Sequence, residues 1–332
     1  MQNFVVSPVK LDNDLIWDGQ LSPFYESYDI VLHNFNQSWS LWLRYALCHQ
    51  ASNKKINQAK LMASFSKEGQ PVESLSQSFE LEKLEIMHTD RFISINGASL
   101  SLSESMGEVK IPNQNIKWEI YFEDPVVSLR VLPKLFLYHL NLPPAKFVQP
   151  RIKTFCSGQV FINHKKYEFK KLPVYQSHTY GNKFPAQWYR ANCINFNEDE
   201  NAIFEGLSQL IKFKNKELCW LKYFCLQMEG KRYYANSLIK MFTNKSNASP
   251  DKWEFEFKKG GYKFMGVIYR QKASTINIDP AYSTSTHQYT AFKSSIEINV
   301  YKKIKGNWTH YKTLSSKDNC CFEWATPLKI DL

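Results

Sequence analysis

The sequence has no long run of hydrophobic residues and no N-terminal stretch typical of an export signal. No segment reaches the roughly 18 uninterrupted apolar residues that a membrane-spanning helix needs, and residues 1–9 lack a cationic stretch followed by an apolar block. Glycine and proline are scarce, at 12 and 14 of 332 residues, which excludes a collagen-like or low-complexity chain. We therefore expect a folded, cytoplasmic protein with no transmembrane segment.

The common motifs for binding phosphates, dinucleotides and catalytic metals are also absent. The chain contains no G-x-x-x-x-G-K-[ST], G-x-G-x-x-G, H-E-x-x-H or G-x-S-x-G motif. The 8 histidines never fall within four residues of one another, and the 7 cysteines include no C-x-x-C pair. We expect no cofactor, no bound metal ion and no disulfide framework.

Long runs of like charge are missing, although the chain is basic. Lys and Arg outnumber Asp and Glu by 42 to 31, a formal net charge of +11. The lysines are scattered in short groups, as at Lys165-Lys166, rather than gathered in a tail. Lysines at strand edges, which block aggregation between sheets, account for this pattern. Basic, aromatic-rich strands such as 165–171 and 262–270 keep nucleic acid as a third candidate partner, one that we do not favour.

Alternation of apolar and polar residues with a period of two is the dominant pattern in the chain. It recurs at residues 118–123, 253–258 and 296–300, where successive side chains would point to opposite faces of a sheet. Turn signals such as Asn96-Gly97 separate many short strands, and in the middle of the chain only residues 134–140 fit a helix. The pattern predicts an all-β protein of antiparallel barrels or sandwiches with few helices.

A boundary between two domains is expected near residue 145. Pro143 and Pro144 interrupt both helices and strand ladders, and the strand pattern restarts at Phe155. The prediction is therefore an N-terminal β domain over residues 1–145 and a C-terminal β domain over residues 146–332.

Large polar residues gather on predicted strands in two segments. In the first, a strand over residues 24–32 places Glu26 and Tyr28 on one face among apolar neighbours. A carboxylate there needs a partner or a raised pKa, and Arg44 on the following strand is the expected partner. The arrangement is either an internal Glu–Arg pair that braces a barrel, or part of a ligand-binding or acid site.

The second segment spans three predicted strands. The side chains that share faces there are His178 with Tyr180, then Trp188 with Arg190 and Asn192, and finally Glu205. So many donors and acceptors directed into one cavity must bind one another, water or a ligand. The alternatives are a satisfied internal polar network and a binding site with catalytic groups.

Several short motifs follow one another within roughly residues 20–210. They are Phe24-Tyr25-Glu26, Lys146 to Pro150 leading to Gly158, His178 before a Gly-Asn turn, Trp188 to Cys193, and Phe204-Glu205. In this order they resemble the double lipocalin-like family of AttH-type proteins, carotenoid hydratases, tocopherol cyclases and fungal Diels–Alderases. The resemblance implies two consecutive lipocalin-like antiparallel barrels packed together, a hydrophobic ligand, and no organic cofactor.

The resemblance also implies protonation or templating of an unsaturated terpenoid or polyketide, giving hydration, cyclisation or isomerisation. The hydratase branch uses a His-x-Trp pair followed by an aromatic-x-Asp pair. Here His178 matches the histidine, but Tyr180 replaces the tryptophan and Arg190 stands in place of the aspartate. Arginine cannot donate a proton at neutral pH because its pKa exceeds about 12. Carotenoid-type hydration is therefore not expected.

Two functions follow for a lipophilic ligand such as a terpenoid, polyketide or lipid. In a cofactor-free enzyme, Arg190 would bind a carboxylate or enolate oxygen, with His178 or Glu205 as the acid or base. In a non-catalytic lipocalin-like carrier, the same cavity would only hold its ligand. The residues expected to contact the ligand are Tyr180, Trp188, Asn192, Glu26, Tyr28 and Arg44.

Overall fold

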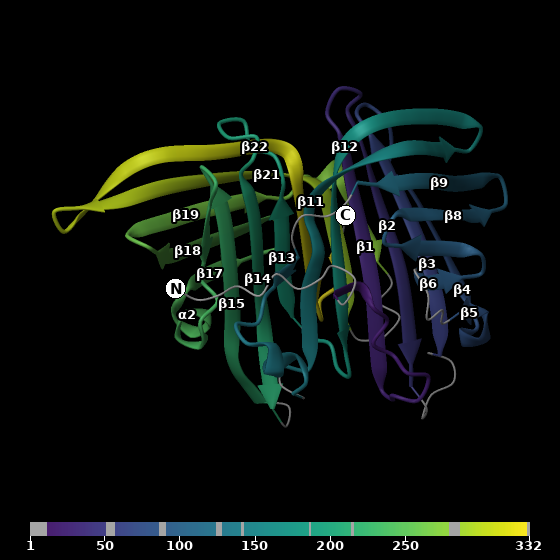
Figure 1. Cartoon of the computed structure of the whole chain (residues 1–332), viewed down its shortest axis with the longest axis horizontal. Helices are drawn as coiled ribbons and strands as arrows, with labels where there is room; N and C mark the ends of the chain where they lie inside the picture. Colours follow the sequence, from purple (N-terminus) through teal and green to yellow (C-terminus); the bar gives the residue numbers. More distant parts are fainter. Residues whose placement is uncertain are drawn as a thin grey trace. The chain divides into compact units, whose positions relative to one another are not determined.

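Two antiparallel sheets make up most of the protein (Figure 1). The structure, a computed structural model, describes residues 12–50, 57–85, 91–123, 128–140, 143–185, 187–213, 216–278 and 286–330. Helix is confined there to α2 (Leu238–Thr243), a turn at residues 12–13 and the 3-10 turns η2 (Leu81–Lys83), η3 (Leu135–Tyr138) and η4 (Lys272–Ser274). None of the helices in this part of the chain could cross a membrane. The all-β prediction is confirmed.

The first compact unit, residues 1–130 and 144–184, contains one sheet. Its strand order is β4-β3-β2-β1-β12-β11-β9-β8-β7-β6-β5, with β10 paired to β11. The backbone N–H of Lys110 in β8 donates to Gln77 Oε1 in β4 at 3.0 Å, so the sheet curls until these strands meet. The strands are β1 (Phe24–Asn34), β2 (Trp39–His49), β3 (Gln58–Lys67), β4 (Glu73–Phe79), β5 (Leu84–Glu85), β6 (Arg91–Ile95), β7 (Ala98–Ser101), β8 (Glu104–Ile111), β9 (Gln114–Phe122), β10 (Leu129–Arg130), β11 (Ala145–Ile162) and β12 (Lys165–Gly181).

The inner face of this first sheet encloses an apolar core. Ile30 and Leu32 of β1 and Leu41 and Leu43 of β2 belong to it, as the alternation on these strands predicts. Trp118 of β9 is completely buried in the same core. Polar residues on this inner face therefore lie in apolar surroundings.

The second compact unit, residues 131–143 and 185–332, contains the other sheet. Its strand order is β16-β15-β14-β13-β22-β21-β19-β18-β17, with β20 paired to β21. The core is rich in aromatic rings: the centroids of Phe204 and Phe255 are 4.7 Å apart, and Tyr233 of β16 lies 5.2 Å from Phe264 of β19. The strands are β13 (Trp188–Cys193), β14 (Ile203–Phe213), β15 (Lys216–Met228), β16 (Lys231–Tyr234), β17 (Lys245–Ala248), β18 (Lys252–Lys259), β19 (Tyr262–Tyr269), β20 (Thr275–Ile278), β21 (His287–Ile304) and β22 (Asn307–Thr326).

The division between the two units differs from the one expected at residue 145. Residues 144–184 belong to the first unit because β12 pairs with β1 and β11 pairs with β9. Residues 131–143 belong to the second unit. Proline marks the place where the strand ladder breaks, but it does not show which earlier strands the following hairpin joins.

Candidate functional site

Glu26 is a completely buried carboxylate on the core-facing side of β1. Its Oε1 accepts the backbone N–H of Ile16 at 2.8 Å, and its Oε2 accepts that of Trp17 at 2.9 Å. The hydroxyl of Tyr28 lies 3.1 Å from Oε1, and His178 Nε2 lies 2.7 Å from the same atom. The two backbone N–H groups and the imidazole replace the water that the carboxylate loses on burial. The single proton of the Tyr28 hydroxyl is shared between Glu26 Oε1 and the carbonyl of Asn13, 2.9 Å away.

His178 in β12 lies between Glu26 and the backbone of the N-terminal segment. It pairs directly with Tyr28 across the strands, and the two rings stack with centroids 4.2 Å apart. Its Nδ1 lies 2.8 Å from the carbonyl oxygen of Asp12. A carbonyl can only accept, so Nδ1 carries a proton. A second proton lies between Nε2 and the Glu26 carboxyl group, which makes the two side chains an acid–base pair.

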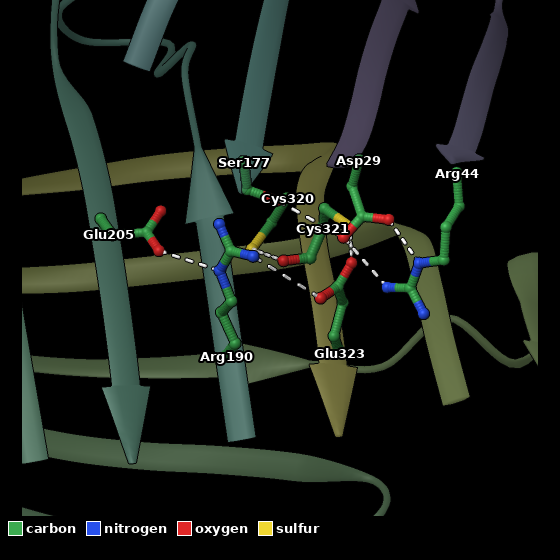
Figure 2. A network of polar contacts seen from close by, with 8 residues as sticks. All are labelled: Asp29, Arg44, Ser177, Arg190, Glu205, Cys320, Cys321 and Glu323. Carbon is green, nitrogen blue, oxygen red and sulfur yellow. Dashed lines mark hydrogen bonds and ion pairs between the residues drawn. The ribbon is translucent and has the colours of Figure 1, made fainter. Parts of the chain in front are cut away.

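Arg44 is not the partner of Glu26, and the pairing expected from the sequence is wrong. Arg44 lies opposite Asp29 in the β1–β2 register. Its Nε and Nη2 donate to the two carboxylate oxygens of Asp29 at 2.5 and 3.0 Å (Figure 2). Asp29 follows Tyr28 directly and therefore points to the opposite face of the sheet. On β2 the core face carries Leu43 and Tyr45, which leaves Arg44 on the other side.

Lys146 joins the Glu26 cluster, although the strand pattern gives no reason to select it. Glu26 pairs with Tyr180, and Tyr180 pairs with Lys146, so the three side chains share one face across β1, β12 and β11. Lys146 is 4% exposed, and burial lowers the pKa of its amine to about 8. Burial, with Glu26 as a further cause, raises the pKa of Tyr180, which therefore remains protonated at neutral pH.

A short segment before β1, residues 12–17, covers this cluster. Besides the contacts with Glu26 and His178, the carbonyl of Asn13 accepts from the Tyr28 hydroxyl at 2.9 Å, and Asn13 Oδ1 accepts from Gln176 at 2.6 Å. The side chain of Asp12 forms an ion pair with Arg130 at 2.6 Å. The inward polar groups of the first unit thus hold a piece of the chain's own backbone.

Arg190 and Glu205 meet in the second unit, but His178, which the sequence groups with them, belongs to the first unit, because its strand β12 pairs with β1. Arg190 Nε donates to Glu205 Oε1 at 3.1 Å, and Arg190 Nη1 lies 4.0 Å from Glu323 Oε2 (Figure 2). All three side chains are buried. Glu323 could not be predicted from the sequence, because β22 comes more than a hundred residues after β13. Only the pairing of these two strands places Glu323 opposite Arg190.

Trp188, Arg190 and Asn192 share the face of β13 that points away from the aromatic core. The intervening Ala191 and Cys193 belong to that core, so the alternation is the predicted one. Asn192 pairs directly with Glu205 across the β13–β14 ladder. These polar groups therefore lie on the opposite side of the sheet from the stacked rings.

The predicted site residues thus form two clusters, one in each compact unit. The first unit holds Glu26, Tyr28, His178, Tyr180 and, on the other face of its sheet, Arg44; the second holds Trp188, Arg190, Asn192 and Glu205. In the described part of the chain, no group of three or more His, Cys, Asp or Glu side chains is placed to hold a metal ion.

Comparison with known proteins gives structural matches only. No family profile and no curated protein matches the sequence. Kievitone hydratase from Nectria haematococca is 10% identical and matches with a TM-score of 0.54 over 91% of this chain and 88% of its own. CghA, solved with Sch210972, is 10% identical with a TM-score of 0.58 over 92% and 89% of the two chains.

An AttH-like protein from Nitrosomonas europaea, 8% identical, matches with a TM-score of 0.53 over 92% of this chain and 91% of its own. At these identities the matches establish the architecture, and the chemistry must be argued from the site. The chain has the double lipocalin-like fold that these three proteins share.

Proposed function

We propose that the protein binds a hydrophobic small molecule, such as a terpenoid, polyketide or lipid, and converts it without an organic cofactor by cyclisation, isomerisation or hydration. The observation that carries the proposal is the Glu26–His178 pair, a titratable pair enclosed by an apolar core. Apolar side chains of similar volume would fill the core without the desolvation cost of a buried ion pair, which supports a functional role for this pair. Proteins of the same fold include kievitone hydratase and CghA solved with Sch210972.

In the proposed reaction His178 transfers the proton and Glu26 holds the imidazole in place. A ligand oxygen or unsaturated carbon that takes the position of the Asp12 carbonyl would face the protonated Nδ1. When His178, protonated on both nitrogens, gives the Nδ1 proton to the ligand, the Nε2 proton remains hydrogen-bonded to Glu26, so the cationic ring becomes neutral. Tyr180 and Lys146, on the same face, would contact the polar end of the ligand.

Arg190 is the proposed anion-binding group of the second cluster. A ligand carboxylate or enolate oxygen would bind its guanidinium in competition with Glu205 Oε1, 3.1 Å away. Glu205 would then be released to act as an acid or base. This role is proposed for the second unit separately from that of His178.

A carrier function is the second candidate, and one observation favours it. Both nitrogens of His178 already have partners, Asp12 O and Glu26 Oε1. A protein that only stores a ligand can keep such a satisfied network, whereas an enzyme must displace residues 12–17 from His178 in each cycle.

Lipophilic extracts of cells producing the wild type, His178→Gln or His310→Gln distinguish the two functions. His310 is exposed, and its substitution is the matched control. An enzyme predicts a product, detected by mass spectrometry, that depends on His178 and survives the control substitution. Identical extracts from all three would contradict the catalytic proposal, and a ligand bound equally by all three would support the carrier.

A further inference from the structure

The second unit carries exposed apolar side chains on two short segments that are in contact just before each begins. In the first segment, η3 and residues 139–140, the exposed apolar side chains are Leu135, Phe136 and Leu140. In the second segment, α2, they are Leu238, Ile239 and Phe242, and Ile239 is 75% exposed. We call these six residues the apolar patch. Asn236 Nδ2, just before α2, donates to the carbonyl of Val131 at 3.5 Å, which joins the two segments.

The backbone holds the apolar patch outward. In α2, Met241 is buried, while Leu238 and Phe242, four residues apart, share the exposed side. In η3, buried Tyr138 accepts the backbone N–H of Leu132 at 3.0 Å, which fixes the turn with its neighbours exposed. Exposed apolar groups gathered in this way are typical of an interaction surface.

The charges around the apolar patch identify its partner. Residues 128–140 and 235–248 contain no Asp or Glu, whereas Lys134 is exposed and Lys240 is half-buried. The amine of Lys222 lies beside α2, where it donates to the carbonyl of Phe242 at 3.3 Å. Apolar side chains bordered by cations match the interface of an anionic bilayer, where the apolar groups insert between lipids and the lysines contact phosphate.

We propose that the apolar patch docks the protein on anionic phospholipid surfaces. Such docking goes beyond the proposed function, and it would bring the protein to the phase in which lipophilic molecules collect. Phe136 and Ile239 insert, and Lys134 and Lys240 select membranes that contain anionic lipid.

Vesicle co-sedimentation of the full chain tests this proposal. The wild type should sediment with phosphatidylcholine vesicles that contain phosphatidylserine, and much less with phosphatidylcholine alone. The double variant Phe136→Ser/Ile239→Ser should lose about tenfold or more in partition. Lys134→Glu/Lys240→Glu should lose the preference for phosphatidylserine. Leu328→Ser, which removes an exposed apolar side chain outside the apolar patch, should bind as the wild type does.

Three results would overturn the proposal: a wild type that stays in the supernatant, a double variant that binds as well as the wild type, or a dimer that the double substitution dissociates in sedimentation velocity. The last result would show that a second copy covers the apolar patch. A lipophilic compound that co-purifies with the wild type, detected by native mass spectrometry, should be bound equally by all these proteins. A failure of the docking proposal is thereby distinguished from a failure of the proposed ligand site.

Discussion

His178 Nε2 lies 2.7 Å from Glu26 Oε1, with both side chains buried in the first unit. The Nδ1 of the same ring binds the carbonyl of Asp12, so one imidazole connects a buried carboxyl group to the segment that closes the cluster. The stability of the first unit and its proposed chemistry therefore depend on the same contacts.

Glu26→Ala should lower the free energy of unfolding by about 3–5 kcal/mol, because it leaves buried donors without an acceptor. Glu26→Gln keeps one oxygen for these donors and should cost less. Urea unfolding at neutral pH measures both values. The exposed Glu82 supplies the control, and Glu82→Ala should change the unfolding free energy by no more than about 0.5 kcal/mol. An equally small effect of Glu26→Ala would show that the cluster is not a stabilising network.

Stability should depend on pH through Lys146. Burial lowers the pKa of this amine from 10.5 to about 8, so between these pH values the unfolded chain binds more protons than the folded one. The free energy of unfolding contributed by Lys146 therefore rises with pH across this window. Buried tyrosines and thiols titrate in the same way in the wild type and in Lys146→Met. The difference between the unfolding free energies of the two proteins therefore reports the titration of Lys146 alone.

Urea unfolding of both proteins at several pH values from 7 to about 10.5 is the measurement. The stability of the wild type relative to Lys146→Met should increase as the pH rises. Lys305 is exposed and supplies the control. The unfolding free energies of the wild type and Lys305→Met should differ by the same amount at every pH. A flat difference for Lys146→Met as well would mean that the buried amine keeps its ordinary pKa.

Gly266 should not tolerate a side chain, because of its close contact with Phe255. A Cβ at this position would lie 2.1 Å from Phe255 Cζ, on the paired strand β18. Gly266→Ala should therefore lower the free energy of unfolding by about 1–3 kcal/mol. Adding Phe255→Leu removes the clashing ring atoms. The double variant should therefore lose less unfolding free energy than the two single variants lose together. Strict additivity would contradict this packing explanation.

Arg190 should contribute to the affinity for an anionic hydrophobic probe. Arg190→Met leaves Glu205 and Glu323 buried without this cation, so Arg190→Met/Glu205→Gln is the variant to use. Titration with 1-anilinonaphthalene-8-sulfonate should show at least about tenfold weaker binding than in the Glu205→Gln single variant. Equal affinity in two folded variants would exclude Arg190 as the anion-binding group.

Local patterns identify the strands and their faces but not which distant strands meet. Alternation correctly places Glu26 beside Tyr28, and Arg190 beside Trp188, because the side-chain period of a strand is fixed by its backbone. The partner of Arg44 could not be obtained in this way, since it depends on the β1–β2 register that pairs it with Asp29.

The remaining members of the site depend on pairing over long sequence distances. Lys146 reaches the Glu26 cluster because β11 lies beside β12, and Glu323 reaches Arg190 because β22 lies beside β13. Residues 12–17 have no strand periodicity at all; hydrogen bonds to Glu26 and His178 hold them in place. The order and pairing of all the strands determine such contacts, so a short sequence motif cannot predict them.

Native mass spectrometry of gently purified protein tests the central claim, that the fold encloses a site for a hydrophobic small molecule. The wild type should carry a lipophilic compound that collisional activation releases, and Glu26→Ala/His178→Phe should lose it while remaining folded. A wild type that carries no such compound and does not bind 1-anilinonaphthalene-8-sulfonate would contradict the account.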